Sequence, residues 1–131
     1  MKTRRDYNFY VYILANYQRS CFYVGFTNDI VRRIIEHQNG FGSFFTIQYK
    51  LKHLIYFEEY RYVHDAINRE KEIKKWSRDK KINLVKTTNP FLSDLSEQLL
   101  IDNEIDQNNI NEYCKYLKDK YKNQPSSCHF K

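Results

Sequence analysis

Two tyrosine-containing triplets near the N-terminus, followed directly by a basic segment, constrain this chain more than any other feature. The triplets are Tyr10-Val11-Tyr12 and Tyr23-Val24-Gly25. Side chains alternate between the two faces of a strand, so residues 9–14 and 21–26 are expected to form an antiparallel hairpin. The pairing would place the hydroxyls of Tyr12 and Tyr23 on one face, where they could orient or deprotonate a water. The alternative is that both are ordinary core or surface aromatic residues, in a chain with 12 Tyr and 9 Phe.

The basic segment after the second triplet has the pattern of an amphipathic helix. Thr27 or Asn28 is expected to cap this helix, and Asn39-Gly40 to end it. Arg33 and His37 are four positions apart and share one face of the helix. The Arg33 guanidinium suits two phosphate oxygens and would also lower the pKa of a nearby tyrosine, whereas the imidazole of His37 suits orienting or protonating. A solvated helix face is the alternative for both residues.

The remainder of the first 90 residues is expected to hold a third strand and two further helices. The strand covers residues 54–60, the first helix begins at Asp65, and a short basic helix covers residues 80–86. Residues 41–50 are expected to be irregular. Asn89 precedes a proline, so it either contacts a phosphate or only stops the basic helix.

Glu70 is the most informative single residue of the second helix. It lies three positions from both Ile67 and Ile73, so a carboxylate interrupts the apolar stripe. A buried carboxylate needs a partner, which is either an arginine from elsewhere in the core or a hard divalent cation. Cationic side chains near Glu70 and on the first helix are expected to bind a nucleic-acid backbone; they are Arg32, Arg69, Lys71, Lys74 and Lys75. Arg32 can also pair with Glu36, one turn further on.

Charge and composition change along the chain. The net charge is +6, but residues 1–90 carry the positive excess and residues 91–131 are mildly acidic, which favours a polyanionic partner for the first part. We expect a domain over residues 1–95 and a helical C-terminal extension over residues 96–131. In the extension, Asn109 and Glu112 are placed as a capping box for an amphipathic helix, and residues 125–131 are expected to fray.

Cellular location is indicated only indirectly. The chain has three cysteines without a Cys-x-x-Cys pair, no apolar leader, and no run long enough to span a bilayer. Free thiols in a reducing cytoplasm are the simplest interpretation. A zinc site is not expected, because Cys128-His129 has no second pair of ligands.

The motifs together resemble the GIY-YIG nuclease family, especially its small, excinuclease-C-like members. The resemblance covers residues 7–95: the two triplets, the Arg-Arg-x-x-Glu-His stretch ending at His37, the motif around Glu70, and Asn89-Pro90. Tyr10 departs from the family by replacing the glycine of the first triplet. The resemblance implies an α/β (α+β) fold, with a three-stranded antiparallel sheet flanked by helices. It also implies phosphodiester hydrolysis with Mg²⁺ or Mn²⁺.

The resemblance also assigns roles to individual residues. Tyr12 and Tyr23 correspond to the family's two tyrosines, and Arg33 to its arginine. Glu70 corresponds to the metal ligand, whereas His37 and Asn89 correspond to auxiliary polar positions. We therefore expect a metal-dependent DNA endonuclease that selects structure rather than sequence, in a family whose domains serve DNA repair among other processes. RNA as substrate, or a nucleic-acid-binding module whose tail recruits a protein, are the alternatives.

Overall fold

A three-stranded antiparallel sheet forms the centre of the molecule. The structure is a computed structural model and describes residues 8–121. The strands are β1 (Phe9–Ala15), β2 (Phe22–Thr27) and β3 (His53–Tyr60), in the order β2-β1-β3. The expected α/β fold with its antiparallel sheet is therefore confirmed. The helices are α1 (Ile30–Gln38), α2 (Phe44–Gln48), α3 (Val63–Lys74), α4 (Arg78–Lys86), α5 (Ser96–Asp102) and α6 (Gln107–Tyr121).

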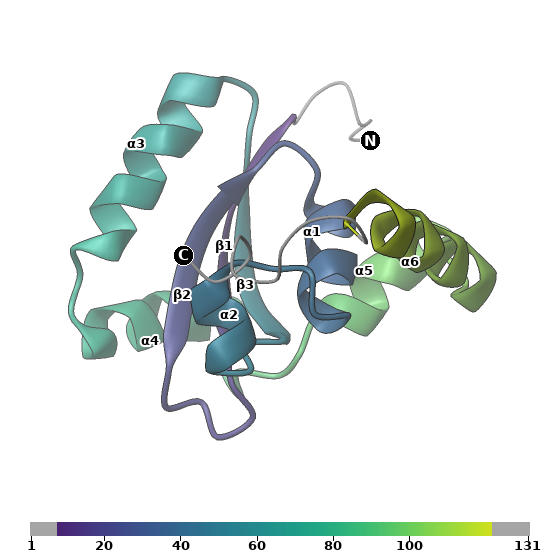
Figure 1. The fold of residues 1–131 in the computed structure, drawn as a ribbon. Helices are drawn as coiled ribbons and strands as arrows, with labels where there is room; N and C mark the ends of the chain where they lie inside the picture. The colour runs from purple at the N-terminus through teal and green to yellow at the C-terminus, as the bar shows by residue number, and fades with distance from the viewer. Residues whose placement is uncertain (1–7, 122–131) are drawn as a thin grey trace.

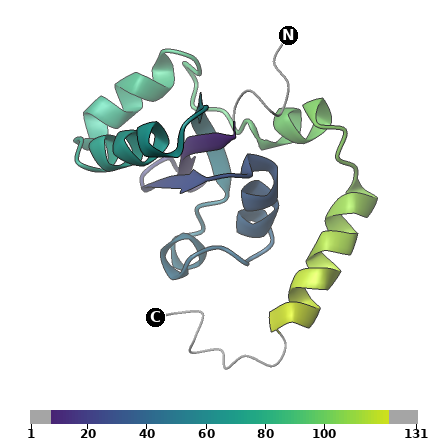
Figure 2. The same cartoon turned by 90° about the horizontal axis from the view of Figure 1, so that it is seen from above.

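Strand alternation gives the sheet two different faces. Helices α3 and α4 cover one face, and α1, α5 and α6 lie on the other (Figure 1; Figure 2 gives the view from above). The face under α3 is apolar, and its buried residues include Val11, Ile13, Val24, Ile55, Ala66 and Ile73. On the face under α1, the strand residues Tyr12, Leu14 and Leu54 pack with Ile34 of α1, with Leu51 and with Leu100 of α5. The alternation expected for the first hairpin is thus present in the packing.

Helix α1 begins one or two residues later than the expected caps, Asn28 or Thr27, would place it. Its cap is Asp29, whose carboxylate accepts a hydrogen bond from the Arg32 amide at 3.1 Å. The Thr27 hydroxyl does not cap the helix; it accepts from the Asp29 amide at 3.1 Å and so shapes the turn before it. The other end agrees with the expectation, since Asn39 is the C-cap and Gly40 has a φ of +83°.

The segment after α1 differs from the expectation of irregular structure over residues 41–50. Residues 44–48 form the short helix α2, because Ser43 caps it by accepting from the Thr46 amide at 3.3 Å. Thr46 is buried, whereas Phe44, Phe45 and Tyr49 are exposed. A single-turn helix of this kind leaves too few residues for a periodic signal.

Helix α3 begins at Val63, two residues before the expected start at Asp65. It ends at Lys74, and Ser77 then caps α4 by accepting from the Lys80 amide at 3.2 Å. Trp76 therefore lies in the connection rather than on the helix. Its ring packs against the guanidinium of Arg69 at 5.0 Å and the ammonium of Lys80 at 4.3 Å.

The C-terminal extension packs on the same side of the sheet as α1. The Leu95 amide donates to the Leu54 carbonyl at 2.7 Å, and Leu100 joins the cluster that contains Tyr12. The capping pair of α6 is Asp106 with Asn109, whose side chains accept from each other's amides, so the expected Asn109–Glu112 box is wrong. A domain boundary at residue 95 stays a prediction, and the expected fraying of residues 125–131 lies outside the described residues.

Between residues 8 and 121, no helix is long and apolar enough to cross a membrane. Cys21 and Cys114 are free thiols, and Cys128 lies beyond the described part of the chain.

Candidate active site

Tyr12, Tyr23 and His37 meet under α1. Their ring centroids lie 6.3 Å apart for the two tyrosines, 5.9 Å for Tyr12 and His37, and 6.1 Å for Tyr23 and His37. Tyr12 pairs with Gly25 across the two strands. A Cβ at Gly25 would lie 2.4 Å from Cζ of Tyr12 and 2.5 Å from its hydroxyl oxygen. Glycine is therefore required here so that the phenol can lie directly on the backbone of β2.

A second glycine seats the imidazole of His37. A Cβ at Gly42 would lie 2.4 Å from Nδ1 of His37. Nε2 of the same ring lies 3.3 Å from the Tyr12 hydroxyl, whereas Nδ1 is buried and has no hydrogen-bond partner within the described part of the chain. Burial, and secondarily the charge of Arg33, lower the pKa of His37 to about 3. His37 is thus neutral near pH 7 and suits orienting Tyr12 rather than donating protons.

Tyr12 and Tyr23 differ in their access to solvent. Tyr12 is 1% exposed, and burial raises its pKa to about 12 although the nearby charge of Arg33 acts in the opposite direction. Arg33 acts to lower the pKa of Tyr12, as expected, but burial raises this pKa by more. Tyr12 therefore remains a protonated phenol. Tyr23 is only partly buried, so its ring is the one of the two that a substrate can reach.

The carboxylate of Glu36, which the sequence spacing suggested as a partner for Arg32, accepts a hydrogen bond from Arg33. Nη1 of Arg33 donates to Oε1 of Glu36 at 2.7 Å, whereas Nε of Arg32 lies 3.8 Å from Oε2. The Tyr113 hydroxyl of α6 donates to the same Oε2 at 2.7 Å. Burial lowers the pKa of Arg33, but Tyr12 and Glu36 together raise it above its usual range. No sequence signal links Tyr113 to this site, because it lies 77 positions from Glu36.

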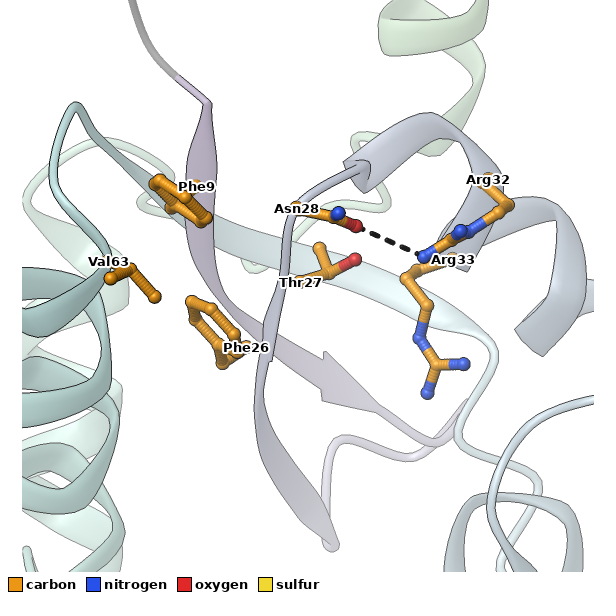
Figure 3. Close-up of a pocket in the computed structure, with 7 residues that line it drawn as sticks. All are labelled: Phe9, Phe26, Thr27, Asn28, Arg32, Arg33 and Val63. Carbon is orange, nitrogen blue, oxygen red and sulfur yellow. Dashed lines mark hydrogen bonds between the residues drawn. The ribbon is translucent and has the colours of Figure 1, made fainter.

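Arg33 also lines an open groove at the end of the sheet. The groove has a volume of about 380 Å³ and lies between the start of α3 and the start of α1 (Figure 3). Phe9 and Phe26 stack in it with centroids 6.0 Å apart, and Arg32 donates to Asn28 at 3.2 Å. The groove thus joins two guanidinium groups and two aromatic rings beside the tyrosine cluster.

Glu70 is not part of this cluster. It lies on α3, which covers the opposite face of the sheet from α1 (Figure 1). Its side chain is 19% exposed and pairs with Lys74 at 3.0 Å, so the expected core arginine is not its partner. Among residues 8–121, no group of three or more His, Cys, Asp or Glu side chains is placed to hold a metal. One carboxylate still fits Mg²⁺, which keeps several waters and takes further oxygens from a phosphate.

Asn89 is buried, and every hydrogen-bonding atom of its side-chain amide has a partner. Its Nδ2 donates to the carbonyls of Ile55 and Ser93 at 2.9 and 2.8 Å, and its Oδ1 accepts from the Ser93 amide at 3.1 Å. This geometry fits the structural alternative, since Asn89 ties the end of α4 to β3 and has no amide hydrogen left for a phosphate.

The cationic side chains of α3 differ in how strongly they are engaged. Arg69 donates to both carboxylate oxygens of Glu58, at 2.9 and 3.0 Å, and also to Glu72. Burial raises the pKa of Glu58, but hydrogen bonds from Arg69, Tyr56 and Tyr60 outweigh it and lower the pKa. Lys71 and Lys75 are exposed, as is Lys74 in its pair with Glu70.

Comparison with known proteins identifies the class. A family model described as the GIY-YIG catalytic domain matches residues 8–83, more than half of the chain. The chain belongs to this family, and its fold is that of a nuclease catalytic domain. The match ends within α4, so α5 and α6 lie outside the matched domain.

Small bacterial proteins are among the relatives. A UPF0213 protein of Staphylococcus saprophyticus is 40% identical over 76 residues, which cover 58% of this chain and 92% of the relative. A UPF0213 protein of Staphylococcus aureus strain N315 is 38% identical over 64 residues, which cover 49% of this chain and 78% of the relative. No solved structure matches the chain.

Proposed function

We propose that this protein is a metal-dependent DNA endonuclease that selects its substrate by structure rather than by sequence. The observation that carries the proposal is the cluster of Tyr12, Tyr23, His37 and Arg33, in which an accessible phenol and a guanidinium lie beside a groove. Oriented hydroxyls and a planar cation are what hydrolysis of a phosphodiester needs, namely a positioned water and compensation of the developing charge.

The roles follow from exposure and hydrogen bonding. Tyr23 orients the attacking water, because Tyr12 is buried and remains protonated. Arg33 binds phosphate oxygens through N–H groups that Glu36 and Tyr12 leave free, since a guanidinium has five. The hydrogen bond between His37 and Tyr12 fixes the orientation of both rings, and Tyr23 packs against them. Asn89 has a structural role in this scheme.

Glu70 is the proposed metal ligand. A bound Mg²⁺ or Mn²⁺ would supply charge neutralisation at the phosphate. The carboxylate is partly exposed and its present partner, Lys74, is a flexible side chain on the same helix. Exposed Lys71, Lys74 and Lys75, together with Arg32, would contact the nucleic-acid backbone, whereas Arg69 is committed to Glu58. The free thiols Cys21 and Cys114 support a cytoplasmic location.

The second candidate is a nucleic-acid-binding module without catalysis. It is favoured by the ion pair between Glu70 and Lys74, which occupies the proposed ligand, and by the helices beyond the matched domain, which add surface for a partner protein.

Cleavage of a labelled panel distinguishes the two candidates. The panel contains single-stranded, duplex, nicked, flap and four-way-junction DNA, together with RNA, each with Mg²⁺, Mn²⁺ or chelator. Wild type is compared with Glu70→Gln and with the matched control Glu72→Gln, an exposed carboxylate two residues away on α3. The endonuclease proposal expects metal-dependent cleavage that is lost in Glu70→Gln and kept in Glu72→Gln. Binding of the panel without cleavage by wild type would support the module instead.

A further inference from the structure

Aromatic side chains continue from Tyr23 across the surface of α2. The ring of Phe45 lies 6.3 Å from that of Tyr23, and the ring of Tyr49 lies 4.7 Å from that of Phe45, centroid to centroid. Phe45 is 41% exposed and Tyr49 is 47% exposed. Large aromatic rings exposed in series, rather than singly, indicate a surface that contacts something.

The series ends in a second groove, at the turn between β1 and β2. This groove has a volume of about 400 Å³, and Tyr49 lines it together with Tyr17, Lys50, Lys52 and His53. Tyr17 is 80% exposed, and its ring lies 6.3 Å from that of His53. Since Tyr49 belongs both to the series on α2 and to the groove, the two surfaces are continuous. Figure 1 shows α2 beside β2, toward the turn that joins β1 and β2.

The chemistry of this surface combines stacking rings with cations. Lys50 and Lys52 are exposed, and no carboxylate lines the groove among the described residues; a neighbouring acid, Asp94, pairs with His53 at 2.8 Å. A single nucleic-acid strand matches this pattern, because its unpaired bases offer flat faces and its phosphates repeat along it. A duplex does not, because its base faces are stacked on one another. An apolar protein partner would leave the two lysines without a complement.

We propose that Tyr23, Phe45, Tyr49 and Tyr17, with Lys50 and Lys52, form an aromatic track that binds single-stranded DNA and leads it to Tyr23 and Arg33. That the bound strand is then cleaved rests on the proposed function, whereas binding of the strand by the track does not depend on cleavage. Arg33 lines the groove of Figure 3 and lies close enough to Tyr12 for its charge to act on that phenol. Tyr23, at the start of the track, lies 6.3 Å from Tyr12 between ring centroids, so one strand can contact both surfaces.

Binding without cleavage tests the track. Fluorescence anisotropy with labelled oligothymidine, in chelator, is measured for wild type, Tyr49→Ala, Tyr49→Phe and Tyr17→Ala. The control is Phe91→Ala, because Phe91 is 89% exposed and lies outside the track. We expect the dissociation constant to rise about tenfold in Tyr49→Ala and to change little in Tyr49→Phe and the control, since the phenyl ring suffices for stacking. Tyr17 is so exposed that Tyr17→Ala should fold as wild type does, and the same direction is expected for it.

The contribution of Lys50 and Lys52 is tested through the salt dependence of binding. The Lys50→Gln/Lys52→Gln double variant is expected to lower the dependence of log affinity on log salt by about 0.7 for each phosphate that the protein no longer neutralises. Equal affinity of wild type, Tyr49→Ala and Tyr17→Ala would overturn the proposal, as would tighter binding of duplex than of single strand. A dimer of wild type that Phe45→Ala and Tyr49→Ala both dissociate would assign the surface to self-association and would also overturn it. Because chelator removes cleavage from the readout, these outcomes are independent of whether the endonuclease proposal holds.

Discussion

The two faces of the sheet are built from the same strands but do different things. The face under α3 and α4 buries Val11, Ile13 and Ile73 completely, and its partly buried carboxylate, Glu58, is paired with Arg69. The face under α1 also has an apolar cluster, but it buries a phenol and an imidazole against two glycine backbones, and Nδ1 of His37 has no hydrogen-bond partner among residues 8–121. Burial of apolar side chains stabilises a domain, whereas burial of polar groups costs stability unless they are paired.

The two sides of the sheet therefore have different roles: the α3 side mainly stabilises the domain, and the α1 side also carries the tyrosine cluster. Alternation along β1 places Val11 and Ile13 on the side of α3 and Tyr12 on the side of α1. Glu70 lies on α3, on the opposite side of the sheet from the tyrosine cluster. The proposed active site therefore requires a substrate that contacts both sides around the edge strand β2. Substitutions on the two sides should therefore separate stability from cleavage.

Gly25→Ala is expected to have the largest effect on the α1 side of the sheet. The added methyl group would overlap the end of the Tyr12 ring, so either the ring or β2 must move. We expect the free energy of unfolding to fall by about 1–3 kcal/mol, and single-turnover cleavage to fall about a hundredfold because the cluster is displaced. Gly40→Ala is the control: it has open space but a φ of +83°, so it should lose about 1 kcal/mol of stability with cleavage unchanged. Full cleavage by Gly25→Ala would separate Tyr12 from the reaction.

Acidification should destabilise the protein through His37. The pKa of His37 is lowered from 6.5 to about 3 in the folded protein, so only the unfolded chain takes up a proton between these values. The free energy of unfolding should therefore fall as pH falls from 6.5, by about 1.4 kcal/mol per pH unit once well below it. Denaturant titrations of wild type and His37→Gln at several pH values test this, because the variant lacks this contribution. Parallel losses in both proteins would show that His37 does not titrate as stated.

Tyr113→Phe should have the smallest effect and defines the role of the extension. It removes the hydrogen bond to Glu36 while keeping the ring. We expect a loss of about 0.5–1.5 kcal/mol in the free energy of unfolding, and a smaller reduction in cleavage than Arg33→Gln gives. The two readouts are thermal unfolding and single-turnover cleavage. Cleavage as low as in Arg33→Gln would instead make Tyr113 essential for positioning the arginine.

Periodicity accounts for what the sequence predicted well. The period of two in the tyrosine strands placed Tyr12 and Tyr23 on one face, and the structure brings their rings to 6.3 Å. The apolar stripe of α1 is buried as expected. Helix α2 was missed because its five residues, two of them exposed aromatics, are too few to carry a helical period.

Partners were harder to predict than elements. The partner of Glu70 is Lys74, one turn further along the same helix. The spacing of four residues is visible in the sequence, but a carboxylate within an apolar stripe was expected to be buried and to find its partner elsewhere. The bond from Tyr113 to Glu36 depends on how α6 packs, which local spacing does not determine. The depth at which Tyr12 is buried, which decides its protonation, likewise emerges only from the packing of the whole sheet.

The most direct test compares Tyr23→Phe with Ile73→Ala, measuring single-turnover cleavage and the free energy of unfolding on the same preparations. Tyr23→Phe should lower cleavage about a hundredfold and change stability by no more than about 0.5 kcal/mol. Ile73→Ala should lose about 2–5 kcal/mol of stability and keep its cleavage rate per folded molecule. Cleavage by Tyr23→Phe at the wild-type rate would contradict the assignment of the tyrosine cluster as the active site.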